Sequence, residues 1–193
     1  MQTFTEKTFN IPALKGISAK TIEEHVKLYA GYVKNANSII EKIPEYQGYT
    51  KEDAFAPYVV SEMHRRFSFE FNGMRNHEIY FSHIEGGPQP LSPDSAIIKA
   101  GFDLEKFKAL ALTRGVGWAM LVWDPVSKQL LHNWVDEQHL GQLNGGKIIL
   151  ALDMWEHSFV ADYQPSGKKQ YVEDFFANLN WQTCEENFAN ATR

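Results

Sequence analysis

The first half of the chain shows the hydrophobic pattern of long helices. Apolar and aromatic residues recur at helical spacing over residues 19–42, directly after Ser18, whose hydroxyl can cap the first turn. We expect Pro44 to end this helix, because proline lacks a backbone donor and clashes with the preceding turn. Residues 46–50 are then predicted to form a turn.

A second helical pattern starts near Lys51 or Pro57 and ends at His83, and it would pair with the first helix as an antiparallel hairpin. Gly73 lies inside this helix, where glycine costs about 1 kcal/mol relative to alanine, so we expect a packing reason for it. The glycine- and proline-rich loop over residues 85–90 then breaks the pattern.

The second half of the chain changes to short helices and strands. The expected elements are, in order, helices opening after residues 92–95 and at 102–107, strands over 115–123, 129–135 and up to Asp153, and helices over 155–163 and 170–179. The predicted fold is α+β. A long antiparallel helical hairpin over residues 1–87 is followed by an α/β half over residues 88–193, with a three-stranded antiparallel sheet flanked by helices.

The composition of the chain argues against several classes of protein. The chain has 193 residues, 44% of them hydrophobic, and a net charge of −5, which argues against non-specific nucleic-acid binding. Because Cys184 is the only cysteine, an internal disulfide framework and a cysteine-based zinc site are excluded. No apolar stretch is long enough to predict a membrane span, and we expect a cytoplasmic protein.

The first candidate for chemistry is the end of the third predicted strand. The apolar run 148–152 ends at Asp153, and His157 follows four residues later. At this spacing a carboxylate and an imidazole can face the same point. Burying an ionised carboxylate is expensive, and a metal ion would offset that cost. A local hydrogen bond between the two side chains at the start of a helix would also offset the cost of burying the carboxylate. The metal site and the local hydrogen bond therefore both remain open.

Each long helix also carries a histidine on a face with aromatic residues. His25 shares its face with Tyr29 and Tyr32, and His77 precedes Tyr80 on the second helix. A helical histidine beside tyrosines is more often a satisfied core group than a metal ligand.

Asp153, Trp155, Glu156 and His157 together resemble the Asp-x-Trp-Glu-His signature of the iron/manganese superoxide dismutases. The resemblance covers nearly the whole chain, since residues 72–77, 115–122 and 175–181 are similar to the family's second-ligand helix, first strand and C-terminal helix. It implies a superoxide dismutase with one iron or manganese ion per subunit. The implied ligands are His25, His77, Asp153 and His157, a nitrogen and oxygen set that suits either metal.

The first ligand departs from the family's spacing. The family places this histidine eight residues before its active-site tyrosine, whereas His25 precedes Tyr32 by seven and Glu24 stands at eight. Seven residues return to nearly the same face of a straight helix, and a one-residue bulge would let eight do the same. We take His25 as the ligand and Glu24 as the alternative.

Tyr32 and Gln138 are the candidate catalytic residues. In the family a glutamine hydrogen-bonds the metal-bound solvent, and in iron-type members it comes from the second-ligand helix, at the position that Gly73 holds here. In manganese-type members it comes from the sheet half, which Gln138 matches, so manganese is slightly favoured. Gln138 as an ordinary loop residue is the alternative.

Other family features are altered. Leu28 and Val160 replace a histidine and a tyrosine that hydrogen-bond each other across the family's dimer, so both ends of one bond are lost together. Glu156, which in the family reaches the ligand histidine of the other subunit, is retained beside His157 and implies a homodimer.

The cations that could steer the superoxide anion are Lys168, Lys169 and Arg75, although lysines on a turn are commonly just solvated. The remaining histidines are interpreted as surface or structural residues: His64, His83, His132 and His139. Two alternatives to a dismutase remain. One is a scaffold of this fold with weakened catalysis that is used for binding, and the other is a different mononuclear metalloenzyme.

Overall fold

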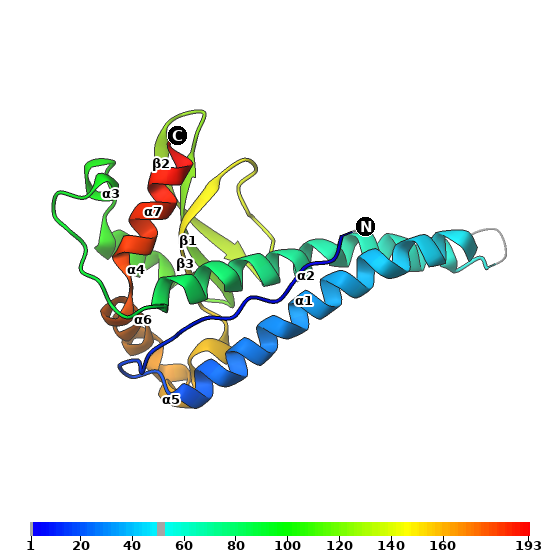
Figure 1. The fold of residues 1–193 in the computed structure, drawn as a ribbon, viewed down its shortest axis with the longest axis horizontal. Helices are drawn as coiled ribbons and strands as arrows, with labels where there is room; N and C mark the ends of the chain where they lie inside the picture. The colour runs from blue at the N-terminus through cyan, green and yellow to red at the C-terminus, as the bar shows by residue number, and fades with distance from the viewer. Residues whose placement is uncertain (1, 50–52) are drawn as a thin grey trace.

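Two long antiparallel helices form an arm that projects from the rest of the molecule (Figure 1). The computed structural model describes residues 2–49 and 53–193. Within them, α1 spans Ala19–Gly48 and α2 spans Ala56–Ile84. The hairpin is therefore confirmed, and α2 begins close to Pro57; the alternative start at Lys51 lies outside the described residues.

The predicted end of the first helix is wrong, because α1 continues through Pro44 to Gly48 and residues 46–48 are helical rather than a turn. A proline removes one hydrogen bond of its own and disfavours the helical conformation of the residue before it, but it does not prevent the residues after it from bonding. The predicted cap is confirmed, since the Ser18 side chain accepts a hydrogen bond from the backbone N–H of Thr21.

An extended N-terminal segment runs along the hairpin (Figure 1). The backbone N–H of Phe4 donates to Asn37 Oδ1 at 2.7 Å, and that of Lys7 donates to the Tyr29 hydroxyl at 2.9 Å. These bonds pair backbone groups that no sheet satisfies, and they hold the segment against α1.

The second half packs short helices around the sheet. Its elements are α3 (Ala96–Lys99), α4 (Leu104–Ala111), β1 (Gly117–Asp124), β2 (Gln129–Asp136), β3 (Lys147–Asp153), a 3₁₀ turn (Glu156–Ser158), α5 (Val160–Tyr163), a second 3₁₀ turn (Pro165–Gly167), α6 (Lys168–Asn178) and α7 (Trp181–Ala191). The strand order is β2-β1-β3 with antiparallel pairing throughout, so the α+β class and the three-stranded sheet are confirmed. No helix in residues 2–49 or 53–193 is apolar over a length that could cross a bilayer.

The helices after β3 differ from the prediction in two places. The helix expected over residues 155–163 is divided into a 3₁₀ turn and α5, because Phe159 leaves helical geometry at φ −145°. The helix expected over residues 170–179 agrees with α6, which ends at Asn178, whereas α7, capped by the Asn180 side chain, was not predicted as a separate helix. An N-cap side chain starts a new helix by satisfying its first free N–H groups, and that signal outweighs the continuing aromatic pattern.

Strand β3 is an edge strand, and side chains from α2 and α7 bond to its free backbone. His83 Nε2 accepts from the Ala151 N–H at 3.2 Å, and Asn187 donates to the Ile149 carbonyl at 3.2 Å. His83 is fully buried, and burial lowers its pKa to about 3, so it is neutral and can accept. The structural role predicted for His83 is thereby confirmed, and the bond ties α2 to β3 two residues before Asp153.

Gly73 allows α1 and α2 to approach each other closely. A Cβ atom added at Gly73 would lie 2.5 Å from Cδ1 of Tyr32, a distance that real side chains do not tolerate. The packing reason expected for this glycine is therefore the ring of Tyr32.

We predict that Gly73→Ala destabilises the protein by about 1–3 kcal/mol, because the steric cost exceeds the gain in helix propensity. Gly31→Ala is the matched control. Gly31 is also helical, and among the described residues nothing lies within 4 Å of the place that its new methyl group would take. It should stabilise the protein by up to about 1 kcal/mol. Denaturant unfolding measures both; a stabilising Gly73→Ala would contradict the packing assignment.

Candidate metal centre

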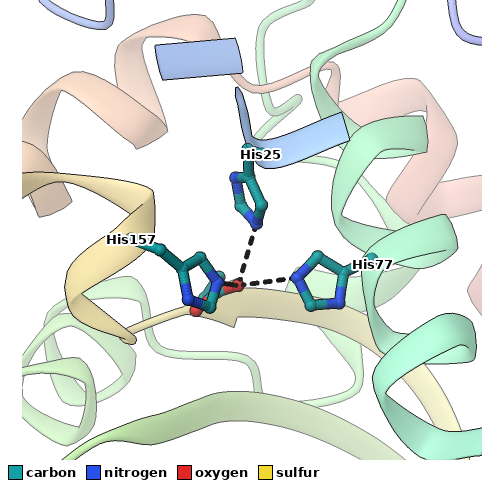
Figure 2. A group of neighbouring side chains, drawn as sticks. His25, His77 and His157 are labelled. Carbon is teal, nitrogen blue, oxygen red and sulfur yellow. Dashed lines mark hydrogen bonds and ion pairs between the residues drawn. The ribbon is translucent and has the colours of Figure 1, made fainter. Parts of the chain in front are cut away.

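Four elements bring three imidazoles and one carboxylate to a single point. His25 comes from α1, His77 from α2, Asp153 from the end of β3 and His157 from the 3₁₀ turn that follows it (Figure 2). One candidate ligand atom from each residue lies within 4.8 Å of those of the other three. Residues 128 positions apart in the sequence thus meet in the core, between the hairpin and the sheet.

All three imidazoles face the same oxygen of Asp153. The Nε2 atoms of His25 and His157 lie 3.1 Å from Asp153 Oδ2, and that of His77 lies 3.4 Å from it. The side chains of His25, His77 and Asp153 are completely buried, while that of His157 is 24% exposed. The cluster is therefore closed on three sides and open to solvent at His157.

The protonation of His77 shows that the cluster suits a cation. His77 Nδ1 lies 2.6 Å from the Gly73 carbonyl oxygen, which can only accept, so Nδ1 carries a proton. Burial lowers the pKa of His77 to about 3, so the ring is neutral and Nε2 has a lone pair. That nitrogen is buried and has no hydrogen-bond partner among the described residues, and it faces a carboxylate oxygen. Two facing acceptors repel each other, and a metal ion between them removes the repulsion.

The carboxylate is held in its ionised form. Burial by itself would raise the pKa of Asp153, but the neighbouring His157 and His25 lower it well below its usual range. Burial also lowers the pKa of His25 despite its bond to Asp153. A neutral imidazole and an ionised carboxylate are the forms that bind metals, so the lowered pKa values leave His25, His77 and Asp153 in the required state at neutral pH.

Bonds outside the cluster orient Asp153. Its Oδ1 accepts from the Trp155 backbone N–H at 2.8 Å, which leaves Oδ2 to face the histidines. Its carbonyl oxygen accepts from the Tyr171 hydroxyl at 2.9 Å and from the Ser158 hydroxyl at 3.0 Å. Partners of this kind fix the direction of a ligand before any metal binds.

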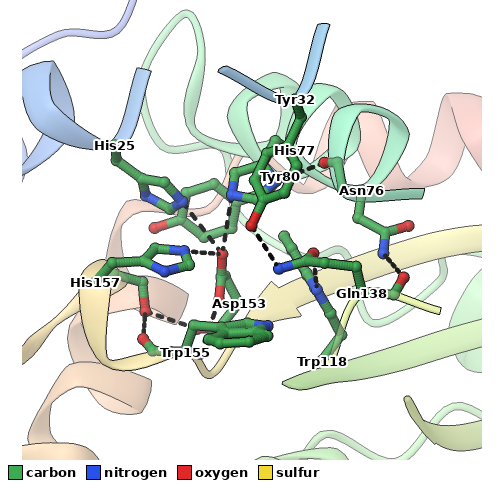
Figure 3. Close-up of polar contacts among 12 residues, drawn as sticks. His25, Tyr32, Asn76, His77, Tyr80, Trp118, Gln138, Asp153, Trp155 and His157 are labelled. Carbon is green, nitrogen blue, oxygen red and sulfur yellow. Dashed lines mark hydrogen bonds and ion pairs between the residues drawn. The ribbon is translucent and has the colours of Figure 1, made fainter. Parts of the chain in front are cut away.

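Gln138 and Tyr32 form a chain of hydrogen bonds beside the cluster (Figure 3). Trp118 Nε1 donates to Gln138 Oε1 at 2.9 Å, and Gln138 Nε2 donates to the Tyr32 hydroxyl at 3.0 Å. Because tryptophan can only donate, it fixes which end of the amide faces Tyr32. The Gln138 side chain is fully buried, so it is not an ordinary exposed loop residue.

Glu24, the alternative first ligand, lies away from the cluster. Its carboxylate is 61% exposed and bonds to Lys27 at 2.9 Å, whereas His25 faces Asp153. Seven residues along a regular helix place His25 and Tyr32 on the same side of α1, as the spacing argument predicts.

A cavity of about 330 Å³ leads from solvent toward Tyr32 and His157, and we call it the entrance cavity. Its walls include Tyr32, Arg66, Phe69, Glu70, Trp155 and His157. Leu28, one of the two residues that replace the family's bridging pair, also lines it.

The cations proposed from the sequence do not line the entrance cavity. Lys168 Nζ donates to the Thr113 carbonyl at 2.7 Å, and Arg75 pairs with Glu78 at 2.8 Å. Arg66, which sequence reasoning missed, does line it. Its only sequence signal is an i,i+4 pairing with Glu70, which is common on exposed helices.

Comparison with known proteins identifies the relatives of this chain. Residues 100–187 match the family described as iron/manganese superoxide dismutases, C-terminal domain. The superoxide dismutase [Fe] of Cupriavidus metallidurans is 33% identical over 189 residues, which cover 93% of this chain and 92% of that protein. That of Pyrobaculum aerophilum is 30% identical over 186 residues, covering 91% and 85%. The superoxide dismutase [Mn/Fe] of Aeropyrum pernix is 31% identical over 178 residues, covering 86% and 80%.

This chain belongs to the iron/manganese superoxide dismutase family. The resemblance drawn from the Asp153–His157 run is thereby confirmed at the level of the family. The relatives carry iron or manganese in their names, so family membership leaves the choice between these two metals open.

We predict that Asp153→Asn lowers the affinity for manganese or iron by more than about 100-fold, since the loss of groups that merely orient ligands already costs 10–100-fold. Asp94→Asn, in an exposed loop, is the control and should keep the wild-type metal content. Elemental analysis after equilibrium dialysis measures the difference. Equal metal content in the two variants would remove Asp153 from the ligand set.

Proposed function

We propose that this protein is a superoxide dismutase. Two superoxide anions and two protons would yield one molecule of oxygen and one of hydrogen peroxide. The observation that supports it best is the buried convergence of three imidazoles and one ionised carboxylate within 4.8 Å, beside a cavity that a small anion can enter. The names of the relatives, each a superoxide dismutase, support the same reaction.

In this proposal His25, His77, Asp153 and His157 hold the metal ion. A bound iron or manganese ion would supply one-electron exchange between its trivalent and divalent states. Asp153 would contribute a buried negative charge, and the buried side chains of His25 and His77 would limit contact with solvent; both help to set the potential at which the exchange occurs.

Tyr32 and Gln138 are proposed to position protons and substrate. Because Gln138 Nε2 donates to the Tyr32 oxygen, the phenolic hydrogen of Tyr32 is free to point into the entrance cavity. Burial raises the pKa of Tyr32, so this hydrogen stays on the phenol at neutral pH. A small anion that enters the cavity would therefore meet a donor.

We propose manganese as the slightly favoured metal, with one ion per subunit. The support is that Gln138 follows β2 in the sheet half, the position that the manganese-type members use, and that its side chain is buried beside Tyr32. Iron is supported by the relatives whose names specify iron. Both metals therefore belong in the activity test.

Two further expectations remain proposals. We place the boundary between the halves at residues 87 and 88, supported by Gly86 and Gly87, which turn the chain with φ of 74° and 87° directly after α2. We also propose a cytoplasmic location, supported by the single, buried Cys184, which suits a reducing compartment.

The homodimer is a proposal as well, with Glu156 of each subunit reaching His157 of the other. Glu156 is exposed beside a histidine that is itself partly open to solvent, so both groups are accessible to a second copy. Such a contact would place a carboxylate against the outer nitrogen of a ligand histidine.

We predict that Glu156→Ala weakens the dimer at least tenfold and lowers metal retention, because it removes the acceptor for a ligand histidine. Sedimentation velocity gives the dimer constant, and elemental analysis gives the metal content. Glu41→Ala, which removes an exposed glutamate on α1, is the control. A monomeric wild type would reject the dimer.

The activity test uses protein loaded separately with manganese and with iron. At least one form should consume superoxide, and Gln138→Ala should lower kcat about 10–100-fold, as expected for a group that tunes a metal site. Gln142→Ala, in the same loop, should match the wild type. A fully loaded wild type without dismutation would instead support a binding scaffold, and peroxidase activity without dismutation would support a different metalloenzyme.

A further inference from the structure

We propose that Arg66 is the residue that draws the superoxide anion into the entrance cavity. This inference rests on the proposed function for the identity of the anion. It concerns a step before the chemistry, the encounter between a small anion and a protein whose net charge is −5. Such a protein repels anions at long range, so a local positive group at the mouth of the site raises the encounter rate.

Arg66 is held in the cavity wall by contacts on two sides. Its guanidinium carbon lies 3.7 Å from the centroid of the Phe69 ring, and the Phe69 ring centroid lies 6.0 Å from that of Tyr32. Its Nε donates to Glu70 Oε1 at 2.8 Å. The planar cation is therefore stacked one ring away from the tyrosine that faces the proposed metal centre.

Arg66 and Glu70 both line the entrance cavity, but the cation is the more exposed member of the pair. The Arg66 side chain is 49% exposed, whereas that of Glu70 is 5% exposed. Glu70 is also covered by Asn35, whose amide lies 3.3 Å from Oε2. Although the pair is neutral in sum, an entering anion would approach its positive end.

Arg66 has donors to spare for an anion. Among residues 2–49 and 53–193, Nε is the only guanidinium nitrogen of Arg66 that makes a hydrogen bond within the chain. Among the described residues that line the cavity, Arg66 is also the only lysine or arginine. The terminal nitrogens form a fork that suits a two-oxygen anion.

A simpler role is that Arg66 merely neutralises the buried carboxylate of Glu70. Removing the arginine alone would then leave an unpaired buried charge and destabilise the protein. The two roles differ when both charges are removed: the double variant Arg66→Gln/Glu70→Gln relieves the unpaired charge but does not restore a cation to the cavity.

The experiment compares kcat/KM for superoxide in the metal-loaded wild type, Arg66→Gln, Arg66→Lys and the double variant. At low ionic strength Arg66→Gln and the double variant should be about threefold to tenfold slower, and Arg66→Lys should retain most of the rate. In 1 M salt, where the Debye length is about 3 Å, the differences should shrink toward none. Arg65→Gln, the same charge change on an exposed neighbour that pairs with Glu62, should match the wild type.

A second measurement does not depend on turnover. Azide is a small anion, and its affinity for each metal-loaded variant can be measured from the absorption of the metal. Arg66→Gln and the double variant Arg66→Gln/Glu70→Gln should bind azide several-fold more weakly than Arg65→Gln does. A wild type that lacks dismutase activity but shows this dependence would reject the proposed function and keep the anion-guiding role.

Three results would overturn the role of Arg66. One is an active wild type with an Arg66→Gln variant of equal kcat/KM and equal azide affinity. Another is recovery of both quantities in the double variant, which would leave Arg66 as the counter-ion of Glu70 only. The third is an equal loss in Arg65→Gln, which would assign the effect to the overall charge of the protein.

Discussion

The ionised carboxylate of Asp153 is completely buried, and the rest of the structure depends on how that charge is satisfied. Desolvating a carboxylate costs several kcal/mol unless hydrogen bonds and opposite charge offset it. One oxygen takes a backbone N–H from Trp155, but the other faces three nitrogens, and the one from His77 presents a lone pair. Among the described residues, the protein atoms leave Nε2 of His77 without a hydrogen-bond partner beside this oxygen, which is the arrangement of a site completed by a cation.

The fold meets this constraint by holding two halves of the chain at a fixed separation. Gly73 lets α1 and α2 approach until the Tyr32 ring fills the space of a side chain, and its carbonyl fixes the tautomer of His77. Six residues beyond His77 along α2, His83 accepts from the backbone N–H of Ala151, near the Asp153 end of β3. The same helix thus carries a ligand and a bond to the strand that carries another, so the geometry of the cluster is set by backbone packing rather than by a flexible loop.

Local signals in the sequence were sufficient for the hairpin and the three strands, whereas the four clustered residues were predicted as a set only from the resemblance to the family. Hydrophobic period identified the helices, and the lone Asp153 after an apolar run marked the end of β3. What local signals could not give were the events that depend on competing neighbours. α1 continues past Pro44, Phe159 interrupts the helix after the cluster, and Asn180 starts α7 inside an aromatic run. The position of Lys168 was equally hidden, because only the folded chain brings the Thr113 carbonyl to its ammonium group.

The residues that line the entrance cavity determine its polarity and its charge, and local sequence signals did not predict either. Leu28 and Val160 replace both ends of the family's polar bridge, so no donor is left without its partner, and Leu28 gives the entrance cavity an apolar wall residue on α1. In the part of the wall that α2 provides, Glu70 is buried although its spacing from Arg66 is that of an ordinary surface pair. A buried carboxylate needs its counter-ion close by, and stacking on Phe69 keeps that counter-ion in the wall of the cavity. Burial of the negative partner therefore leaves the positive partner facing the solvent, and a neutral pair can present one sign of charge to a small ion.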